Sequence, residues 1–169
     1  INPQIDISYN LFSLYDTILQ NHWNYFQKNL SNTRNSQEDL MKIFTTYGQY
    51  LCNGSPIDPQ IGRVIMASLE VLNEKWHLYD KTFFKNSLLK SFMTTLLRLI
   101  ISSDGILFYD QIITILFNMS EKNKPALHEC LAAVFSDKTK IVQLCEVTDL
   151  PTFANIMEIL IQDSNVVHQ

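Results

Sequence analysis

The residues that most often carry out chemistry in proteins are few and widely separated in this sequence. The four histidines, His22, His77, His128 and His168, have no carboxylate or cysteine at the spacing of a metal-ligand set. Imidazoles of this kind are usually surface groups or hydrogen-bonded core groups. We therefore expect no metal site in this chain.

The three cysteines could serve as nucleophiles or form disulfides, but their pattern favours neither role. Cys52, Cys130 and Cys145 are odd in number, lie far apart and form no Cys-x-x-Cys motif. Free cysteine behaves as a small buried hydrophobe, which predicts reduced core thiols in a cytosolic or nuclear protein. Cys130 lies on the apolar stripe of its helix, so we interpret it as an inert thiol.

Glu70 and Glu74 are four residues apart, a spacing that places two carboxylates on one helical face as in an acid–base pair. Long helices carry such pairs routinely on their solvated face, and we interpret this pair in that way. The four glycines form no phosphate-binding loop and no Gly-x-Ser-x-Gly motif. The sequence therefore predicts a protein that is not an enzyme, with no catalytic residue and no cofactor.

Composition points to an ordinary soluble unit. The chain has 169 residues, of which 46% are hydrophobic and 18% charged, enough to bury a sizeable core. Its formal net charge is -4, so it has no basic excess for binding nucleic acid. The most apolar stretch, residues 87–101, is interrupted by Lys90 and Arg98 and is too short to span a membrane.

The chain begins with Ile1 and a polar segment that lacks the features of a secretory signal. We therefore expect it to be a piece of a longer protein.

Apolar residues recur at intervals of three and four along most of the chain, which is the period of a helix. The clearest case follows Asp58, a good N-cap, and Pro59, which is well tolerated in the first helical turn. A single apolar stripe continues from there over five turns: Ile61, Val64, Ile65, Leu69, Leu72 and Trp76. The pattern predicts a helix from Asp58 to Trp76.

Similar patterns predict helices over most of the remaining chain. We expect core faces formed by Leu11, Leu14, Tyr15 and Ile18, by Trp23, Phe26 and Leu30, by Leu40 to Leu51 after a Ser36 cap, by Phe83 to Ile100 after an Asp80 cap, and by residues 106–119, 125–134, 141–145 and 150–162. The segment 106–119 is rich in Ile, so a buried strand is its alternative. No partner strand is predicted elsewhere, which favours a helix.

About nine helices joined by short polar turns indicate an all-α fold. Short turns make neighbouring helices antiparallel, and a helix pair recurs at roughly forty residues, as in HEAT and armadillo repeats. We therefore predict an α-solenoid of about four to five helical hairpins, forming a single helical-repeat domain over residues 1–169. No sequence repeat relates the pairs, and a compact irregular helical bundle is the alternative.

Aromatic residues occur in three clusters: Trp23, Tyr25 and Phe26; Trp76 and Tyr79; Phe83 and Phe84. One interpretation is that they pack between helices in the core. The other is that part of one cluster is an exposed anchor for a partner protein, because Trp and Tyr are enriched at binding hot spots.

Five strings of residues occur in order along the chain: His22-Trp23-Asn24-Tyr25-Phe26, Tyr47-Gly48-Gln49, Leu69 to Asn73 with Leu78 to Phe84, Phe117-Asn118-Met119, and Asp149-Leu150-Pro151-Thr152-Phe153. In order and approximate spacing they resemble the C-terminal end of an exportin, a nuclear export receptor of the karyopherin (importin-beta) family. The resemblance covers about Leu11 to Asp163, with a poorer match over Leu127 to Glu146.

This resemblance implies a superhelix of HEAT repeats that carries cargo out of the nucleus together with GTP-bound Ran. It implies actin, usually with profilin, as the cargo, contacts with nucleoporins, and shuttling between nucleus and cytoplasm. Karyopherins hold Ran mainly through N-terminal repeats, which this chain lacks, so we expect weak or no Ran binding by the chain alone. The resemblance assigns no individual partner-binding residue.

Three hypotheses follow for the function of the chain. The first is a non-enzymatic receptor segment in which the helices at 58–76 and 106–119 contribute to a cargo or Ran surface. The second is a structural C-terminal cap, supported by the polar side chains that the last helix carries on one side: Asn155, Glu158, Gln162 and Asp163. The third is a helical scaffold unrelated to nuclear transport.

Overall fold

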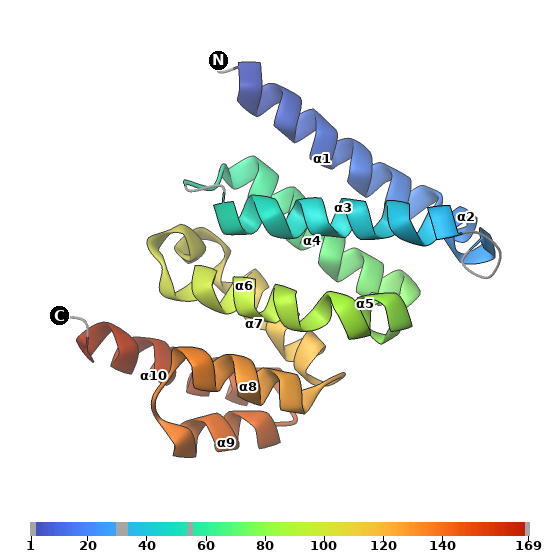
Figure 1. Cartoon of the computed structure of the whole chain (residues 1–169). Coiled ribbons are helices and arrows are strands. Elements are labelled where there is room, and N and C mark those ends of the chain that lie inside the picture. Colours follow the sequence, from blue (N-terminus) through green and yellow to red (C-terminus); the bar gives the residue numbers. More distant parts are fainter. Residues whose placement is uncertain (1–2, 30–33, 54–55, 168–169) are drawn as a thin grey trace. The chain divides into compact units, whose positions relative to one another are not determined.

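The computed structural model describes residues 3–29, 34–53 and 56–167 of the chain. Within these residues the chain forms ten α-helices, two 3₁₀ helices and no β-strand (Figure 1). The predicted all-α class is confirmed, and residues 109–119 are helical rather than extended. The chain divides into two compact units between Leu88 and Leu89.

Unit 1 begins with three helices, α1 (Pro3–Asn21), α2 (Trp23–Asn29) and α3 (Arg34–Asn53). It continues with α4 (Pro59–Trp76), the 3₁₀ helix η1 (Leu78–Asp80) and α5 (Thr82–Ser87). Helices α3 and α4 run in opposite directions (Figure 1), as the short connection between them predicts.

Unit 2 begins with α6 (Leu89–Ile101), the 3₁₀ helix η2 (Ser103–Phe108) and α7 (Tyr109–Ser120). It ends with α8 (Lys124–Val134), α9 (Lys138–Glu146) and α10 (Leu150–Val167), which alternate in direction (Figure 1). Within the part of the chain that the structure describes, no single helix is both long and apolar enough to cross a membrane; only α6 and residues 104–120 taken together, bent by 115°, reach that length and composition.

The start of α4 has the cap that the sequence predicts. The Asp58 carboxylate accepts hydrogen bonds from the backbone N–H groups of Gln60 at 3.0 Å and Ile61 at 3.2 Å, and Pro59 occupies the first turn. The helix ends at Trp76, where His77 adopts a left-handed conformation with φ 54°. The predicted helix from Asp58 to Trp76 is therefore confirmed.

Three helices of unit 2 begin with similar side-chain caps. Asn123 accepts a hydrogen bond from the Ala126 N–H at 3.1 Å, Asp137 from the Lys140 N–H at 3.1 Å, and Asp149 from the Thr152 N–H at 2.9 Å. Each carboxylate or amide satisfies a backbone donor that the first helical turn leaves without a partner. The helices predicted over residues 125–134, 141–145 and 150–162 are thus present, although α9 begins already at Lys138.

The helix predicted from Asp80 through Ile100 is wrong in two respects. Asp80 belongs to η1 rather than capping a helix, because buried Tyr79 packs against Phe84 at a ring distance of 5.6 Å and the chain makes a tight turn there. The helical run is also interrupted at Leu88, whose φ of -119° separates α5 from α6. Apolar residues continue on both sides of this break, so the spacing of apolar residues alone does not reveal it.

Two other expected boundaries differ from the structure. Helix α3 already includes Arg34, so buried Ser36 lies within its first turn and is not the N-cap. The last helix was expected over residues 150–162, but it continues through the polar segment Asp163-Ser164-Asn165 to Val167. The expected core residue Leu30 lies outside the described residues, as do Gly54 and Ser55, which the sequence also favours as the end of the helix that contains Leu51. Helix ends are the least certain part of a sequence-based assignment.

The face of α1 that packs on unit 1 also differs from the expectation. Phe12 and Leu19 are buried, whereas Leu11 and Leu14 are 40% and 54% exposed. The ring of Phe12 lies 5.9 Å from that of Tyr47 on α3. The apolar residues of α1 occupy an arc wide enough for two neighbours, so the pattern alone does not show which part of the arc is covered.

An aromatic cluster fills the core of unit 1. The ring of Phe44 on α3 lies 5.9 Å from Tyr47, 6.1 Å from Phe83 and 5.6 Å from Phe84. The buried Tyr47 hydroxyl and Ser68 Oγ on α4 are hydrogen-bonded at 3.1 Å, and burial raises the pKa of Tyr47 above its ordinary value. This bond gives two buried polar atoms a partner and links α3 to α4.

Removal of the α4 cap tests this description of the fold. We expect Asp58→Ala to lower the free energy of unfolding by about 1 kcal/mol, because two N–H groups of the first turn lose their acceptor. Urea denaturation followed by circular dichroism measures this change. The matched control is Gln49→Ala at an exposed position within α3, which should change stability by less than about 0.5 kcal/mol. Equal effects of the two substitutions would contradict the capping role.

Candidate functional site

The histidines do not come together in the structure. His22, His77 and His128 are exposed on α1–α2, at the end of α4 and on α8, and His168 lies outside the described residues. In the described ranges, no group of three or more His, Cys, Asp or Glu side chains is placed to hold a metal ion.

The cysteines are free thiols, but only one is a fully buried core residue. Cys130 is buried as predicted, whereas Cys145 is half-buried and burial raises the pKa of its thiol. Cys52 is exposed, so the expectation of a core thiol is wrong there. It follows the exposed residues Thr45 and Gln49 at helical spacing, and thus lies on the solvent face of α3.

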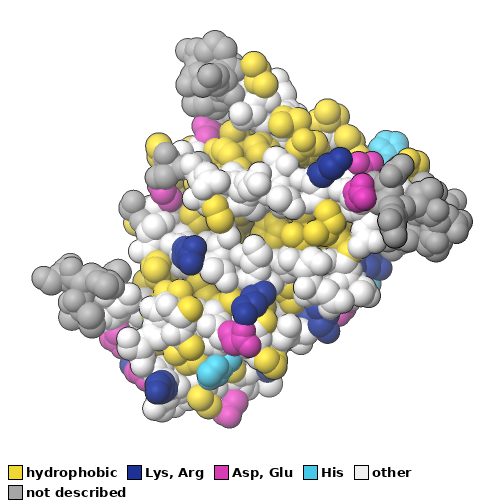
Figure 2. Space-filling view, in the orientation of Figure 1, with side chains coloured by type: hydrophobic (Ala, Val, Ile, Leu, Met, Phe, Trp, Pro, Cys, Tyr) yellow, Lys and Arg dark blue, Asp and Glu magenta, His cyan; other side chains and the backbone are white. Residues whose placement is uncertain are grey.

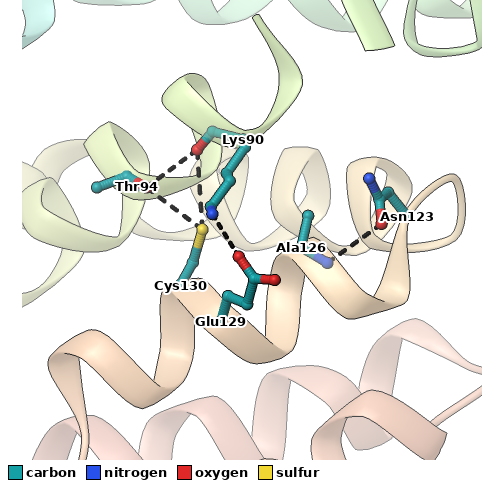
Figure 3. Close-up of polar contacts among 6 residues, drawn as sticks. All are labelled: Lys90, Thr94, Asn123, Ala126, Glu129 and Cys130. Atoms are coloured by element: carbon teal, nitrogen blue, oxygen red, sulfur yellow. Dashed lines mark hydrogen bonds and ion pairs between the residues drawn. The ribbon is translucent and has the colours of Figure 1, made fainter. Parts of the chain in front are cut away.

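Polar contacts around Cys130 connect α8 to α6 (Figure 3). Its Sγ atom lies 3.3 Å from Thr94 Oγ1 and 3.8 Å from the Lys90 carbonyl oxygen. The Lys90 ammonium donates to the Glu129 carboxylate, which raises the pKa of Lys90 and lowers that of Glu129. Since these groups bind one another, this cluster attaches two helices rather than forming a reactive site.

The paired glutamates of α4 have different environments. Glu74 is exposed, as expected for a solvated pair, but Glu70 is only partly exposed. Burial, and secondarily the negative charge of Glu74, raise the pKa of Glu70. The carboxylate of Glu70 is therefore less favourable in the folded chain than in the unfolded chain.

Most of the aromatic residues that the sequence singled out serve as packing residues. Trp23 and Phe26 are 1% and 5% exposed, and the ring of Trp23 stacks on that of Trp76 at 6.3 Å. Tyr79, Phe83 and Phe84 are also buried. Tyr25 is the exception, because 60% of its surface is exposed. It is the member of its cluster that could contact a partner.

The turn between α6 and α7 presents two adjacent apolar side chains to solvent. Ile106 is 72% exposed and Leu107 is 63% exposed, although both neighbours in the chain, Gly105 and Phe108, are buried. Isolated surface leucines are common in proteins, but an adjacent exposed pair makes a small continuous apolar patch. We call residues 106 and 107 the apolar turn.

The apolar turn is held firmly against the end of α6. Ser102 donates to the Leu99 carbonyl oxygen through both its N–H, at 3.0 Å, and its Oγ, at 2.8 Å. A Cβ atom added at Gly105 would lie 2.0 Å from the same oxygen, so only glycine fits this approach. With Phe108 buried on the other side, the apolar turn has a fixed position at the surface of unit 2.

The two helices that the sequence suggested as a partner surface differ in exposure. Helix α7 is largely covered, and in the described part of the chain Asp110 is its one exposed residue. The accessible part of the predicted 106–119 segment is therefore the apolar turn that precedes α7. Helix α4 exposes a mostly polar face made of Gln60, Arg63, Ala67, Glu74 and Lys75.

A pocket of about 590 Å³ lies in unit 2 beside the α8–α9 connection and α10. Val134, Phe135 and Leu160 contribute apolar walls. The carboxylates of Asp137 and Asp163 also line it, and both bind the Lys140 ammonium, at 3.3 Å and 2.9 Å. Because both carboxylates bind Lys140, they hold α9 against α10 and are not available to bind a ligand in the pocket.

Comparison with known proteins identifies relatives over nearly the whole chain. The family model described as "Exportin-6, C-terminal TPR repeats" matches residues 19–168. Exportin-6-A of Xenopus laevis is 25% identical and covers 95% of this chain, and Exportin-6 of Danio rerio is 28% identical and covers 77%. Exportin-6 of Homo sapiens is 27% identical and covers 70%. No solved structure matches the chain.

The aligned region is a small part of these relatives, since it covers 16%, 12% and 11% of the three proteins respectively. The family description names TPR repeats, whereas the sequence suggested HEAT or armadillo repeats. Both are arrays of antiparallel helix pairs, and the predicted class of an all-α helical-repeat fold is confirmed.

The structure predicts opposite results for two neighbouring aromatic residues. Trp23→Ala should lower the free energy of unfolding by about 3–5 kcal/mol, because it removes a buried ring that stacks on Trp76. Tyr25→Ala should change it by less than about 1 kcal/mol, because the ring is mostly exposed. Urea denaturation of both variants measures the difference. A large loss for Tyr25→Ala would show that this residue belongs to the core.

The environment of Glu70 predicts a dependence of stability on pH. A carboxyl group with a raised pKa in the folded state destabilises the fold once it ionises, so Glu70→Gln should be more stable than the unsubstituted chain at pH 7. The difference should vanish as the pH falls below the ordinary pKa of glutamate, where both chains carry a neutral group. Thermal unfolding between pH 3 and 7 measures it, with Glu38→Gln at an exposed site of α3 as the control. No gain at pH 7 would contradict the assigned burial.

Proposed function

Since the chain belongs to the family of exportin-6 C-terminal TPR repeats, we propose that it is the protein-binding C-terminal part of a nuclear export receptor. The family match over residues 19–168 is the observation that carries this proposal. The chain acts by binding proteins and not as an enzyme.

Actin, usually with profilin, is the cargo that we propose for the full-length receptor. It would be carried together with GTP-bound Ran and past nucleoporins, in a protein that shuttles between nucleus and cytoplasm. Ran would be held mainly by repeats outside this chain. Helical-repeat arrays suit this function, because stacked helix pairs offer long surfaces that can wrap a globular protein and can change curvature.

Within this chain, the apolar turn is the surface best suited to contact a cargo protein. Ile106 and Leu107 are already exposed and their backbone is held in place. Binding a partner through them therefore costs little conformational entropy. Two apolar side chains on a rigid support can insert into a pocket of a partner and act as binding hot spots. The exposed face of α4 carries charged and amide groups. Such groups orient a binding partner more than they raise the affinity for it.

Capture of profilin–actin by the full-length receptor, in the presence of GTP-loaded Ran, tests the proposal. The double substitution Ile106→Ser with Leu107→Ser should weaken capture roughly tenfold, since loss of a hot spot costs about 1–2 kcal/mol. Both side chains are mostly exposed, so the unfolding temperature should stay unchanged. The matched control is Val142→Ser with Ile159→Ser, which alters two other exposed apolar residues of unit 2 and should leave capture intact.

The other results distinguish the alternatives. Undiminished capture by the apolar-turn variant, and also by a receptor that lacks this chain, would exclude a cargo contact and favour a structural cap. No capture by the unsubstituted receptor would show that actin is not its cargo. It would leave the scaffold unrelated to nuclear transport as the remaining hypothesis.

A structural cap is the second candidate function, and the surface of α10 favours it. Phe153, Met157 and Leu160 are buried, while the exposed side is mostly polar: Thr152, Asn155, Glu158, Gln162 and Asp163. Terminal repeats of helical arrays need a polar outer face to remain soluble. A cap and a cargo contact are compatible, because α10 and the apolar turn are different surfaces.

A further inference from the structure

The charges beside the apolar turn are mainly negative. Asp104 precedes the apolar turn by two residues, in the 3₁₀ helix η2, and is half-buried. Asp110 follows it by three residues, in the first turn of α7, and is exposed. Residues 99–121 contain no Lys or Arg. A carboxylate therefore lies on each side of the apolar turn along the chain, with no cation in the same stretch.

A third carboxylate reaches the start of α7 from α10. Helices α7 and α10 pack against each other within unit 2. Burial raises the pKa of Tyr109, the first residue of α7, and the negative charges of Glu158 and Asp110 raise that pKa further. Charges shift a pKa in this way when they lie close to the group. The start of α7, directly after the apolar turn, thus carries negative charge from two helices.

The positive groups near the apolar turn are fewer. Helices α6 and α7 pack on η2 within unit 2, and α7 has no Lys or Arg. Helix α6 has two such residues, Lys90 in its first turn and Arg98 in its last turn. Lys90 is at the far end of α6 from the apolar turn and binds Glu129. Arg98 is the one cation that these two helices place near the turn, so carboxylates outnumber cations there.

The carboxylate of Asp110 is available to a partner. Between residues that the structure describes, the ion pairs of unit 2 are Lys90–Glu129, Lys140–Asp137 and Lys140–Asp163. Asp110 takes part in none of these and is exposed. On the face that Figure 2 shows, Lys and Arg side chains are scattered singly and form no basic patch. Within the described residues, no ion pair therefore neutralises Asp110 beside the apolar turn.

We propose that the apolar turn, with Asp104 and Asp110 beside it, recognises a cargo surface in which an apolar pocket is bordered by Lys or Arg side chains. This inference rests on the proposed function, because it takes the apolar turn as a cargo contact. Ile106 and Leu107 enter the pocket, and the two carboxylates face its basic border. A pocket with an acidic border would bring like charges together and is rejected.

The two parts of this surface act on different steps of binding. Attraction between Asp110 and a basic border speeds the encounter and orients the partners, and salt screens that attraction. The apolar side chains act after contact, when they leave water, and they mainly determine how slowly the complex dissociates. Substitutions of the carboxylate and of the apolar pair should therefore change different rate constants.

Association kinetics of the full-length receptor with profilin–actin, in the presence of GTP-loaded Ran, test the inference. At about 50 mM salt, Asp110→Asn should slow association about threefold and Asp110→Lys about tenfold, with little change in the dissociation rate. At about 300 mM salt these differences should shrink to within about twofold, because the charges are screened. Ile106→Ser with Leu107→Ser should instead speed dissociation.

The matched controls are Glu121→Gln and Glu121→Lys, which change the charge equally at an exposed residue beyond the opposite end of α7. They should leave the association rate within about twofold of that of the unsubstituted receptor. A carboxylate in the first turn of a helix also stabilises the helix, so the unfolding temperature of each variant is measured alongside. A purely structural role of Asp110 would lower that temperature and leave the salt dependence of association unchanged.

Three results would overturn the inference. Faster association of Asp110→Lys would show that the border of the partner's pocket is acidic. Equal association rates for the Asp110 and Glu121 variants would show that the charge beside the apolar turn is not recognised, while faster dissociation of the apolar-turn variant would still support the proposed function. No association of the unsubstituted receptor would be a failure of the proposed function itself, and the inference would fail with it.

Discussion

Helix α6 has apolar side chains on most of its circumference, and unit 2 is arranged around the need to cover them. Its buried residues are Leu89, Phe92, Met93, Thr95, Leu96, Leu97, Leu99 and Ile100. A single neighbour cannot cover such a wide arc, and within unit 2 the helices α7, α8 and α10 and the 3₁₀ helix η2 all contact α6. The close approach of Gly105 to Leu99 is part of this covering. The apolar turn owes its fixed position to the same contact.

The core of unit 1 is filled by aromatic rings, and a few specific hydrogen bonds join its helices. Large rings fill the space between α3, α4 and α5, and their hydroxyl groups need partners, because an unpaired buried polar group costs about 1–3 kcal/mol. Tyr47 finds Ser68, and Tyr79 donates to the Leu69 carbonyl oxygen at 3.3 Å. The Tyr50 hydroxyl accepts the Asp58 N–H at 3.0 Å, which ties α3 to the first residue before α4. These bonds fix which faces of the helices meet, while the rings supply most of the buried apolar area.

The local signal at the start of α4 predicted the structure correctly, whereas the Ser36 cap did not. Asp58 with Pro59 marks a helix start because capping needs only the first turn. The interruption at Leu88 and the role of Asp80 could not be predicted, since they depend on how Tyr79 and Phe84 pack. The exposure of Cys52, and of Leu11 and Leu14 on α1, depends on which helices pack beside them. The exposure of the apolar turn was not predicted for the same reason. The pattern of residues 106–119 places Ile106 and Leu107 at the start of a buried helix, and only the contact of Gly105 with Leu99 shows that they lie in an exposed turn.

The exposed apolar residues of this chain contribute little to its own folding, and their chemistry therefore calls for another explanation. Full burial of a Leu or Ile side chain stabilises a fold by about 1.5–3 kcal/mol. Because Ile106 and Leu107 are 72% and 63% exposed, they contribute only a small part of that stabilisation. The same holds for Ile7 and Leu14 on α1. Polar residues would serve a free-standing fold better at all four positions, as they do along α10. The two pairs differ in form, since Ile7 and Leu14 lie along one face of a helix whereas Ile106 and Leu107 lie in a short turn whose backbone approaches the end of α6.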